Sequence, residues 1–188
     1  FNGADAMFTG IANTFVVRDR YEDVIAALTS SDIGDNESVT AALAGIVSES
    51  ASAMPSGNVE SHLAIINALC ASESTLDVYT AIEQLNTDDK WLLKAQKGIA
   101  HGSPVSVLLI DEQLKRSRGL SLADVFKTEI LLSTTIIRYP EFAEGVRALL
   151  IDKDNSPAWQ FADVASVPAG IVESFFSAPW ESNPLEDL

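Results

Sequence analysis

The stretch that best defines the local structure of this chain covers residues 141–159 and reads EFAEGVRALLIDKDNSPAW. Its first part predicts a helix, because apolar residues recur at helical spacing on one face, namely Phe142, Val146, Leu149 and Leu150. Glu144 and Arg147 lie three residues apart on the flank of that face, where they can form an ion pair. Residues 152–157 predict a turn that ends the helix, because Asp and Asn bond their own backbone and proline stops a helix. Trp159 is expected to fold back as an apolar anchor.

The same stretch resembles the C-terminal signature of the 3-hydroxyisobutyryl-CoA hydrolases, a branch of the crotonase (enoyl-CoA hydratase/isomerase) superfamily. The residues that carry the resemblance are Phe142, 144–148, 150–154, 156–157 and Trp159. The Glu-Gly pair with an apolar run is found across the superfamily, whereas the continuation from Ile-Asp-Lys-Asp to Pro-x-Trp is more specific to the hydrolases. Residues 2–17 and 103–129 resemble the same family at matching relative positions, so the resemblance covers three ordered blocks.

The amino-acid composition limits the classes of molecule that this chain is expected to bind. The 188 residues are 47% hydrophobic, enough to bury a sizeable core, and their formal net charge is −15. A surface this acidic repels phosphate backbones and anionic lipid, so we expect neither nucleic acid nor membrane as a partner. The longest apolar run, residues 63–71, is much shorter than the roughly 20 residues of a membrane span. The single cysteine, Cys70, excludes an internal disulfide and a cysteine metal cluster.

The remaining sequence is predicted to be helical apart from one strand. Asn2 is placed to cap a first helix and Gly10 to end it, and residues 14–17, Thr-Phe-Val-Val, are the one convincing strand. Ser103 and Pro104 start a helix in the preferred manner, as a cap followed by a first-turn proline. Further helices are expected over residues 21–28, 37–51, 59–69, one capped by Ser74 or Thr75, 88–101 capped by Thr87, 104–118, and 122–137 capped by Ser121.

The predicted fold class is therefore mainly α: the helical C-terminal portion of a crotonase-type fold, with one short strand left from the core domain. In this interpretation residues 1–20 are the helix–strand remnant of the core and residues 21–188 are the C-terminal helical region. An isolated strand cannot satisfy its own backbone, so residues 14–17 need a partner that the sequence does not supply. This predicts, independently of the resemblance, that the chain is part of a larger fold.

Glu129 is the residue that most invites a chemical interpretation, because it falls on the apolar face set by Leu122, Val125, Phe126 and Ile130. A buried carboxylate must be paired or protonated. A general acid/base role is one interpretation; a buried structural pair with Arg147 is the other, and we favour it because ionic networks also place acids in cores.

The turn supplies the candidates for substrate binding: Lys153, Asp154 and Trp159. Lys153 is either a point charge for a CoA phosphate or a solvated residue, and the sequence favours neither. The turn is not a calcium loop, because Pro157 stands where an EF-hand needs glycine, and we expect no metal site.

No catalytic residue is expected within these 188 residues. In the crotonase-like hydrolases, two backbone N–H groups form an oxyanion hole and a glutamate and an aspartate do the chemistry, on segments preceding the block matched here by residues 2–17. The resemblance thus implies the C-terminal part of an acyl-CoA thioester hydrolase of valine catabolism, acting on 3-hydroxyisobutyryl-CoA. This part would cover the active site and support binding of the CoA ester, and would be inactive alone.

Two alternatives stay open: part of an enoyl-CoA hydratase/isomerase, or a non-catalytic helical interaction module. The resemblance implies an acyl-CoA substrate, no cofactor and self-association as a further expectation. The expected location is the cytoplasm, or the mitochondrial matrix in a eukaryote.

Overall fold

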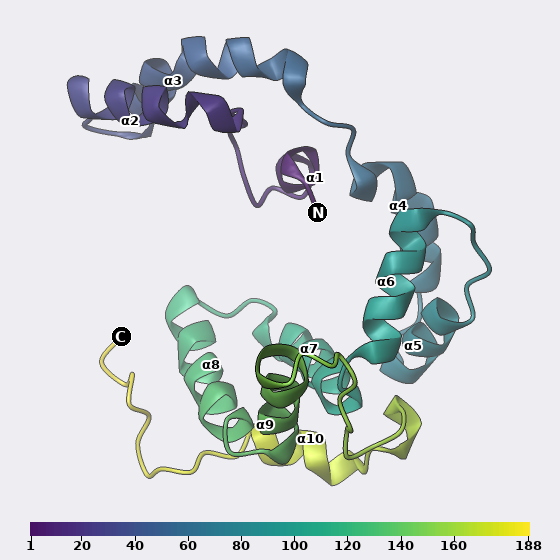
Figure 1. Ribbon diagram of the computed structural model, residues 1–188. Helices are drawn as coiled ribbons and strands as arrows, with labels where there is room; N and C mark the ends of the chain where they lie inside the picture. The colour runs from purple at the N-terminus through teal and green to yellow at the C-terminus, as the bar shows by residue number, and fades with distance from the viewer. The chain divides into compact units, whose positions relative to one another are not determined.

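The computed structural model describes all 188 residues and consists of helices joined by loops (Figure 1). The predicted helical class is confirmed, and no helix is long and apolar enough to cross a membrane. The chain forms two compact units, Phe1–Cys70 and Ala71–Leu188, each described here by itself. The predicted boundary after residue 20 concerns a family core and its helical extension, and it stays a prediction.

The first unit contains four α-helices. They are α1 (Gly3–Phe8), α2 (Tyr21–Ser30), α3 (Asn36–Ser50) and α4 (Asn58–Leu69), with short 3-10 turns at Arg18–Arg20 and Ala51–Ala53. Helices α2 and α3 run side by side, and α1 packs against α4 (Figure 1).

A fully buried carboxylate, Asp5, connects α1 to α4. Its N–H donates to Asn2 Oδ1 at 3.0 Å while its own Oδ2 accepts from the Asn2 N–H at 2.9 Å, so the predicted Asn2 cap is confirmed as a capping box. The other carboxylate oxygen accepts from the Val59 N–H, 2.7 Å away, at the start of α4, where Gly57 has no side chain to cap with. Burial raises the pKa of Asp5, but hydrogen bonds from Val59 and Asn2 outweigh it and the pKa is lowered.

The predicted strand at residues 14–17 is wrong: these residues form neither strand nor helix. Strand pairing needs a neighbouring strand, and no strand exists anywhere in the structure. The Val17 N–H instead donates to Ser50 Oγ at 3.3 Å, and the buried Ser50 hydroxyl donates to Ile46 O at 2.7 Å.

The second unit contains six α-helices. They are α5 (Thr75–Glu83), α6 (Lys90–His101), α7 (Pro104–Ser117), α8 (Leu122–Ile136), α9 (Pro140–Val146) and α10 (Ala169–Phe175). A π-helical turn, Arg147–Ile151, directly continues α9, and a 3-10 turn occupies Val164–Ser166. The predicted caps Ser74, Ser103 and Ser121 are confirmed, and a positive φ of 78° at Gly119 follows the end of α7.

The cap predicted at Thr87 is wrong by two residues. Asp89 caps α6, because its Oδ1 accepts from the N–H groups of Trp91 at 2.8 Å and Leu92 at 3.0 Å. Thr87 lies two residues before Asp89, and its side-chain oxygen accepts from the Asp89 N–H, so Thr87 supports the cap rather than making it.

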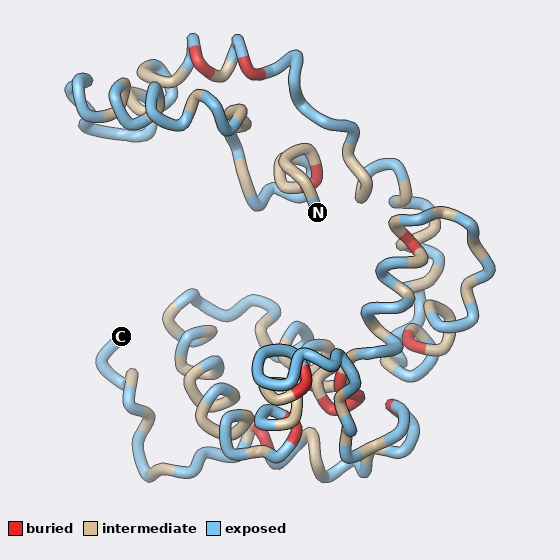
Figure 2. Tube along the Cα trace, in the orientation of Figure 1, coloured by how far each residue is buried: buried red, intermediate tan, exposed pale blue.

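The core of this unit lies where α7 meets α10, and its buried residues are Val105, Leu109 and Phe175 (Figure 2). Tyr139 packs edge-on against Phe175, with ring centroids 5.0 Å apart. This core fixes the start of α9, and therefore the segment that the sequence singled out.

Candidate functional site

The site is built on the end of α9 and the loop that follows it. The chain turns back on the π-helical residues because Lys153 and Asn155 adopt left-handed backbone conformations, with φ of 56° and 51°. The Asn155 N–H then donates to Ala148 O, 3.1 Å away, which closes the turn. The predicted turn at residues 152–157 is confirmed.

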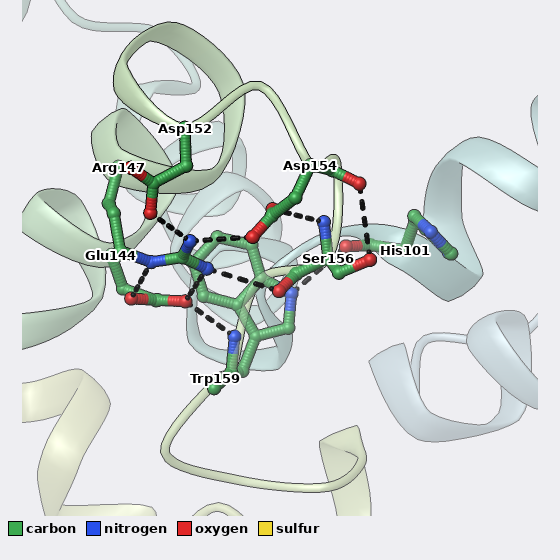
Figure 3. Close-up of polar contacts among 8 residues, drawn as sticks. His101, Glu144, Arg147, Asp152, Asp154, Ser156 and Trp159 are labelled. Atoms are coloured by element: carbon green, nitrogen blue, oxygen red, sulfur yellow. Dashed lines mark hydrogen bonds and ion pairs between the residues drawn. The ribbon is translucent and has the colours of Figure 1, made fainter.

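The side chain of Arg147, directly after α9, makes most of the contacts that hold this loop (Figure 3). Its Nε and Nη2 donate to the two carboxylate oxygens of Glu144 at 2.9 and 2.7 Å, so the predicted Glu144–Arg147 pair is confirmed as a two-point contact. Its Nη1 donates to Asp152 and Asp154, both at 2.7 Å, and Nη2 also donates to Ser156 O at 3.2 Å. These contacts use all five N–H donors of the guanidinium. They connect Glu144 on the helix with Asp152, Asp154 and Ser156 in the loop.

The electrostatics follow from this geometry. Hydrogen bonds from Arg147, supported by the Ala158 N–H, lower the pKa of Glu144 to about 2. Arg147 and the Ser156 N–H likewise lower the pKa of Asp154, and the three acids raise the pKa of Arg147. Glu144, Asp154 and Arg147 are therefore ionised at neutral pH, so that two negative groups face one positive group.

Trp159 closes the loop onto α6. Its indole N–H donates to His101 O, 2.9 Å away, so the ring spans from the loop to the end of that helix (Figure 3). The ring lies so close to α9 that a Cβ built on Gly145 would stand 3.2 Å from it. Trp159 is therefore a structural anchor, and Gly145 provides the space for its ring.

Beside the loop lies a cavity of about 430 Å³ with mostly apolar walls. Its walls include Val105, Ile136, Phe142, Val146, Leu149, Leu150, Trp159 and Phe175. Its most buried charged residue is Glu141, whose side chain accepts from the Ser103 hydroxyl and, at 3.0 Å, from the Gln160 N–H. Since Ser103 Oγ also accepts from the Ser106 N–H at 3.0 Å, Glu141 connects the starts of α7 and α9.

The predicted buried pair between Glu129 and Arg147 is wrong. Glu129 is exposed and accepts only a 3.3 Å hydrogen bond from Gln113, while every donor of Arg147 is used elsewhere. The helix face expected to be buried is only partly covered: Leu122 is 71% and Phe126 46% exposed, whereas Val125 and Ile130 are half-buried. The buried acid is instead Glu141, which the sequence did not single out; its place one residue after Pro140 gave no sign of Ser103, 38 residues away.

The three predicted binding residues are placed differently from one another. Asp154 and Trp159 use their polar groups in the contacts just described. Lys153 is exposed at the tip of the loop, and its ammonium makes no hydrogen bond or ion pair. No group of three or more His, Cys, Asp or Glu side chains is placed to hold a metal ion.

Comparisons with known proteins identify the family to which this chain belongs. The family model described as enoyl-CoA hydratase/isomerase matches residues 1–176. The 3-hydroxyisobutyryl-CoA hydrolase-like protein 5 of Arabidopsis thaliana is 30% identical over 190 residues, covering 98% of this chain and 48% of the relative. The human mitochondrial 3-hydroxyisobutyryl-CoA hydrolase is 32% identical, covering 94% of this chain and 45% of the human protein.

A solved enzyme structure has a fold similar to that of this chain. The crystal structure of a carnitinyl-CoA dehydratase from Mycobacterium thermoresistibile superimposes with a TM-score of 0.79 at 26% identity, covering 97% of this chain and 49% of that one. The chain spans about half the length of the curated relatives and the solved structure that it matches. The match to the family model and the relatives at 30% identity or more agree with the fold, and the chain belongs to the enoyl-CoA hydratase/isomerase family.

Proposed function

We propose that this chain is the C-terminal part of an acyl-CoA thioester hydrolase whose preferred substrate is 3-hydroxyisobutyryl-CoA. The observation that carries the proposal is the match to a 3-hydroxyisobutyryl-CoA hydrolase-like protein across 98% of the chain. The catalytic residues would lie in the part of the protein that precedes these residues. The human relative is named as mitochondrial, and in a eukaryote we expect the mitochondrial matrix for this protein, and otherwise the cytoplasm.

The role proposed for the loop at residues 152–159 is to present a cation to the CoA ester. Arg147 holds the loop rigidly but has no donor left for a ligand. Lys153 projects from the same rigid loop with its ammonium unpaired, so it is the charge that can meet a phosphate. Asp154 and Trp159 would contribute by fixing the loop.

The reaction is tested with the full-length protein and with the 188-residue chain, each given 3-hydroxyisobutyryl-CoA in an assay for released CoA thiol. We expect turnover by the full-length protein and none by the chain. Turnover by the pure chain would move the chemistry onto its own acids, and failure of the full-length protein to release the thiol would overturn the hydrolase proposal.

The role of Lys153 is tested by comparing two thioesters of the same acid, one with CoA and one with pantetheine, which lacks the nucleotide phosphates. Lys153→Ala in the full-length protein should raise KM for the CoA ester and leave KM for the pantetheine ester unchanged, and Lys153→Arg should restore it. Lys94→Ala, which removes another exposed lysine, is the matched control. Equal effects on both esters would contradict a phosphate contact.

A second candidate is a hydratase or dehydratase of the same family, and the likeness to a carnitinyl-CoA dehydratase favours it. This enzyme would add water across the C=C bond of an enoyl-CoA, or remove water from a hydroxyacyl-CoA, without releasing CoA thiol. Incubation with an enoyl-CoA, followed at the absorbance of the conjugated thioester, separates the two. A full-length protein inactive in both assays would leave the non-catalytic helical module.

A further inference from the structure

We propose that Asn155 is a positioning residue: it holds the backbone of Lys153 in a left-handed conformation and thereby directs the Lys153 ammonium toward a phosphate of the CoA ester. This inference rests on the proposed function in one respect, the contact between Lys153 and CoA. It does not depend on whether the protein hydrolyses the thioester or hydrates an enoyl group, because both kinds of substrate carry the same CoA phosphates.

Lys153 and Asn155 are the only two non-glycine residues of the chain with a positive φ, 56° and 51° respectively. Asparagine tolerates this left-handed conformation, because its short polar side chain bonds the local backbone. Lysine lacks this compensation, so the backbone of Lys153 is strained. Strained residues persist only where the surrounding structure holds them, and they cluster at functional sites. The strain at Lys153 therefore needs a structural cause, and it points to a role for the side chain.

Asn155 supplies the structural cause through both its backbone and its side chain. The Asn155 N–H donates to Ala148 O at 3.1 Å, which brings the chain back onto the helical turn that precedes the loop. The side-chain amide of Asn155 donates to Lys153 O at 3.3 Å, so it bonds the strained residue directly. These two contacts fix the position of the Lys153 carbonyl relative to the helix, and both depend on Asn155 keeping its own left-handed conformation.

The two acids that flank Lys153 do not pair with it. Asp152 and Asp154 both accept from Arg147 Nη1 at 2.7 Å, and these bonds fix the residues on either side of Lys153. The Lys153 side chain is exposed and its ammonium makes no hydrogen bond or ion pair. The backbone of Lys153 is thus held on both sides while its charge stays available, which is the arrangement needed to present a cation to a phosphate.

The backbone at position 153 favours glycine over lysine. Glycine adopts a positive φ without strain, and it would lose no hydrogen bond or ion pair of the Lys153 side chain. Lys153→Gly should therefore raise Tm of the full-length protein relative to Lys153→Ala, by about 1–3 °C, because both changes remove the ammonium and only glycine relieves the strain. A glycine variant that melts with or below the alanine variant would overturn the strain on which the positioning role depends.

The role of Asn155 is tested by calorimetric titration of the full-length protein with free CoA and with pantetheine, which lacks the nucleotide phosphates. Lys153→Ala should raise Kd for CoA about two- to fivefold, as expected for one exposed charge pair, and leave Kd for pantetheine unchanged. Asn155→Ala disfavours the positive φ and removes the bond to Lys153 O, so it should raise Kd for CoA by a similar factor. Asn155→Gly keeps the positive φ and should retain most of the affinity.

A double variant, Asn155→Ala with Lys153→Ala, shows whether Asn155 acts through Lys153. We expect it to bind CoA no more weakly than Lys153→Ala alone, because the position of the side chain no longer matters once the ammonium is gone. Gly119→Ala is the matched control, since it places alanine at another left-handed position, with φ 78° and open space around the added Cβ. This control should lower Tm and leave Kd for CoA unchanged.

The outcomes separate the positioning role from the contact on which it rests. Additive losses in the double variant, or full CoA affinity in Asn155→Ala, would overturn the positioning role and leave the contact between Lys153 and CoA in place. An unchanged Kd for CoA in Lys153→Ala would contradict that contact and the positioning role together. Neither result depends on the release of CoA thiol, so a protein without thioesterase activity is tested equally well.

Discussion

Glu144 and Arg147 meet one helical turn apart, and both oxygens of the carboxylate accept from the guanidinium, at 2.9 and 2.7 Å. The same carboxylate accepts from the Ala158 N–H at 2.7 Å, so one pair fixes the helix end and the returning loop together. This contact therefore holds the loop that carries Lys153 against the end of α9.

The first prediction concerns the pH dependence of this pair. The pKa of Glu144 falls from an ordinary value of 4.5 to about 2 on folding, so its contribution to stability is present above pH 4.5 and is lost as the pH falls toward 2. The carboxyl carbon of Glu144, followed by NMR, should titrate near pH 2. In Arg147→Gln it should titrate closer to pH 4.5, and an unchanged midpoint in this variant would show that Arg147 is not the cause.

The second prediction concerns Gly145. Replacing a glycine within a helix by alanine normally stabilises the folded protein. In α6, where no atom lies within 4 Å of a Cβ added to Gly98, Gly98→Ala should stabilise the chain by about 0.5–1 kcal/mol. Gly145→Ala should lose this gain, because the new Cβ would stand 3.2 Å from the Trp159 ring. Faster exchange of the Trp159 indole N–H, which is bound to His101 O, would report the displaced ring. Equal stabilisation by both variants would contradict the close approach.

The third prediction concerns the core between α7 and α10. Leu109 is 6% exposed, so Leu109→Ala should cost about 2–5 kcal/mol of unfolding free energy in the second unit. The same change at Leu122, which is 71% exposed, should stay within about 0.5 kcal/mol. Urea unfolding followed by circular dichroism measures both, and similar costs at the two leucines would show the core misplaced.

The fourth prediction concerns Glu141. Glu141→Ala leaves the Gln160 N–H and the Ser103 hydroxyl without their acceptor, which should cost about 1–3 kcal/mol. Glu141→Gln should cost less, because the amide oxygen still accepts from Gln160 and the amide N–H can donate to Ser103 Oγ. Chemical denaturation compares the two variants, and an alanine variant as stable as the glutamine variant would show that these bonds contribute little.

Several features were predictable because they depend on residues close together in sequence. The serine caps at positions 74, 103 and 121, the left-handed glycines at 10 and 119, and the Glu144–Arg147 pair each act within about one helical turn. The turn at residues 152–157 was predictable for the same reason. The cap of α6 was not predictable to the residue, since Thr87 and Asp89 are neighbouring polar residues that both favour a helix start, and Asp89 makes the cap.

The sequence by itself thus determined that this chain is helical, where most of its helices begin and end, and which family signature it carries. Only the tertiary structure decided which acid is buried. Glu141 is enclosed because its helix start meets Ser103 at the start of α7, whereas Glu129 on α8 stays exposed and meets only Gln113. The sequence also did not decide whether residues 14–17 form a strand, despite their strand propensity. A strand forms only when another strand lies beside it. Capping and turn chemistry are local, but burial and pairing depend on which distant surfaces meet.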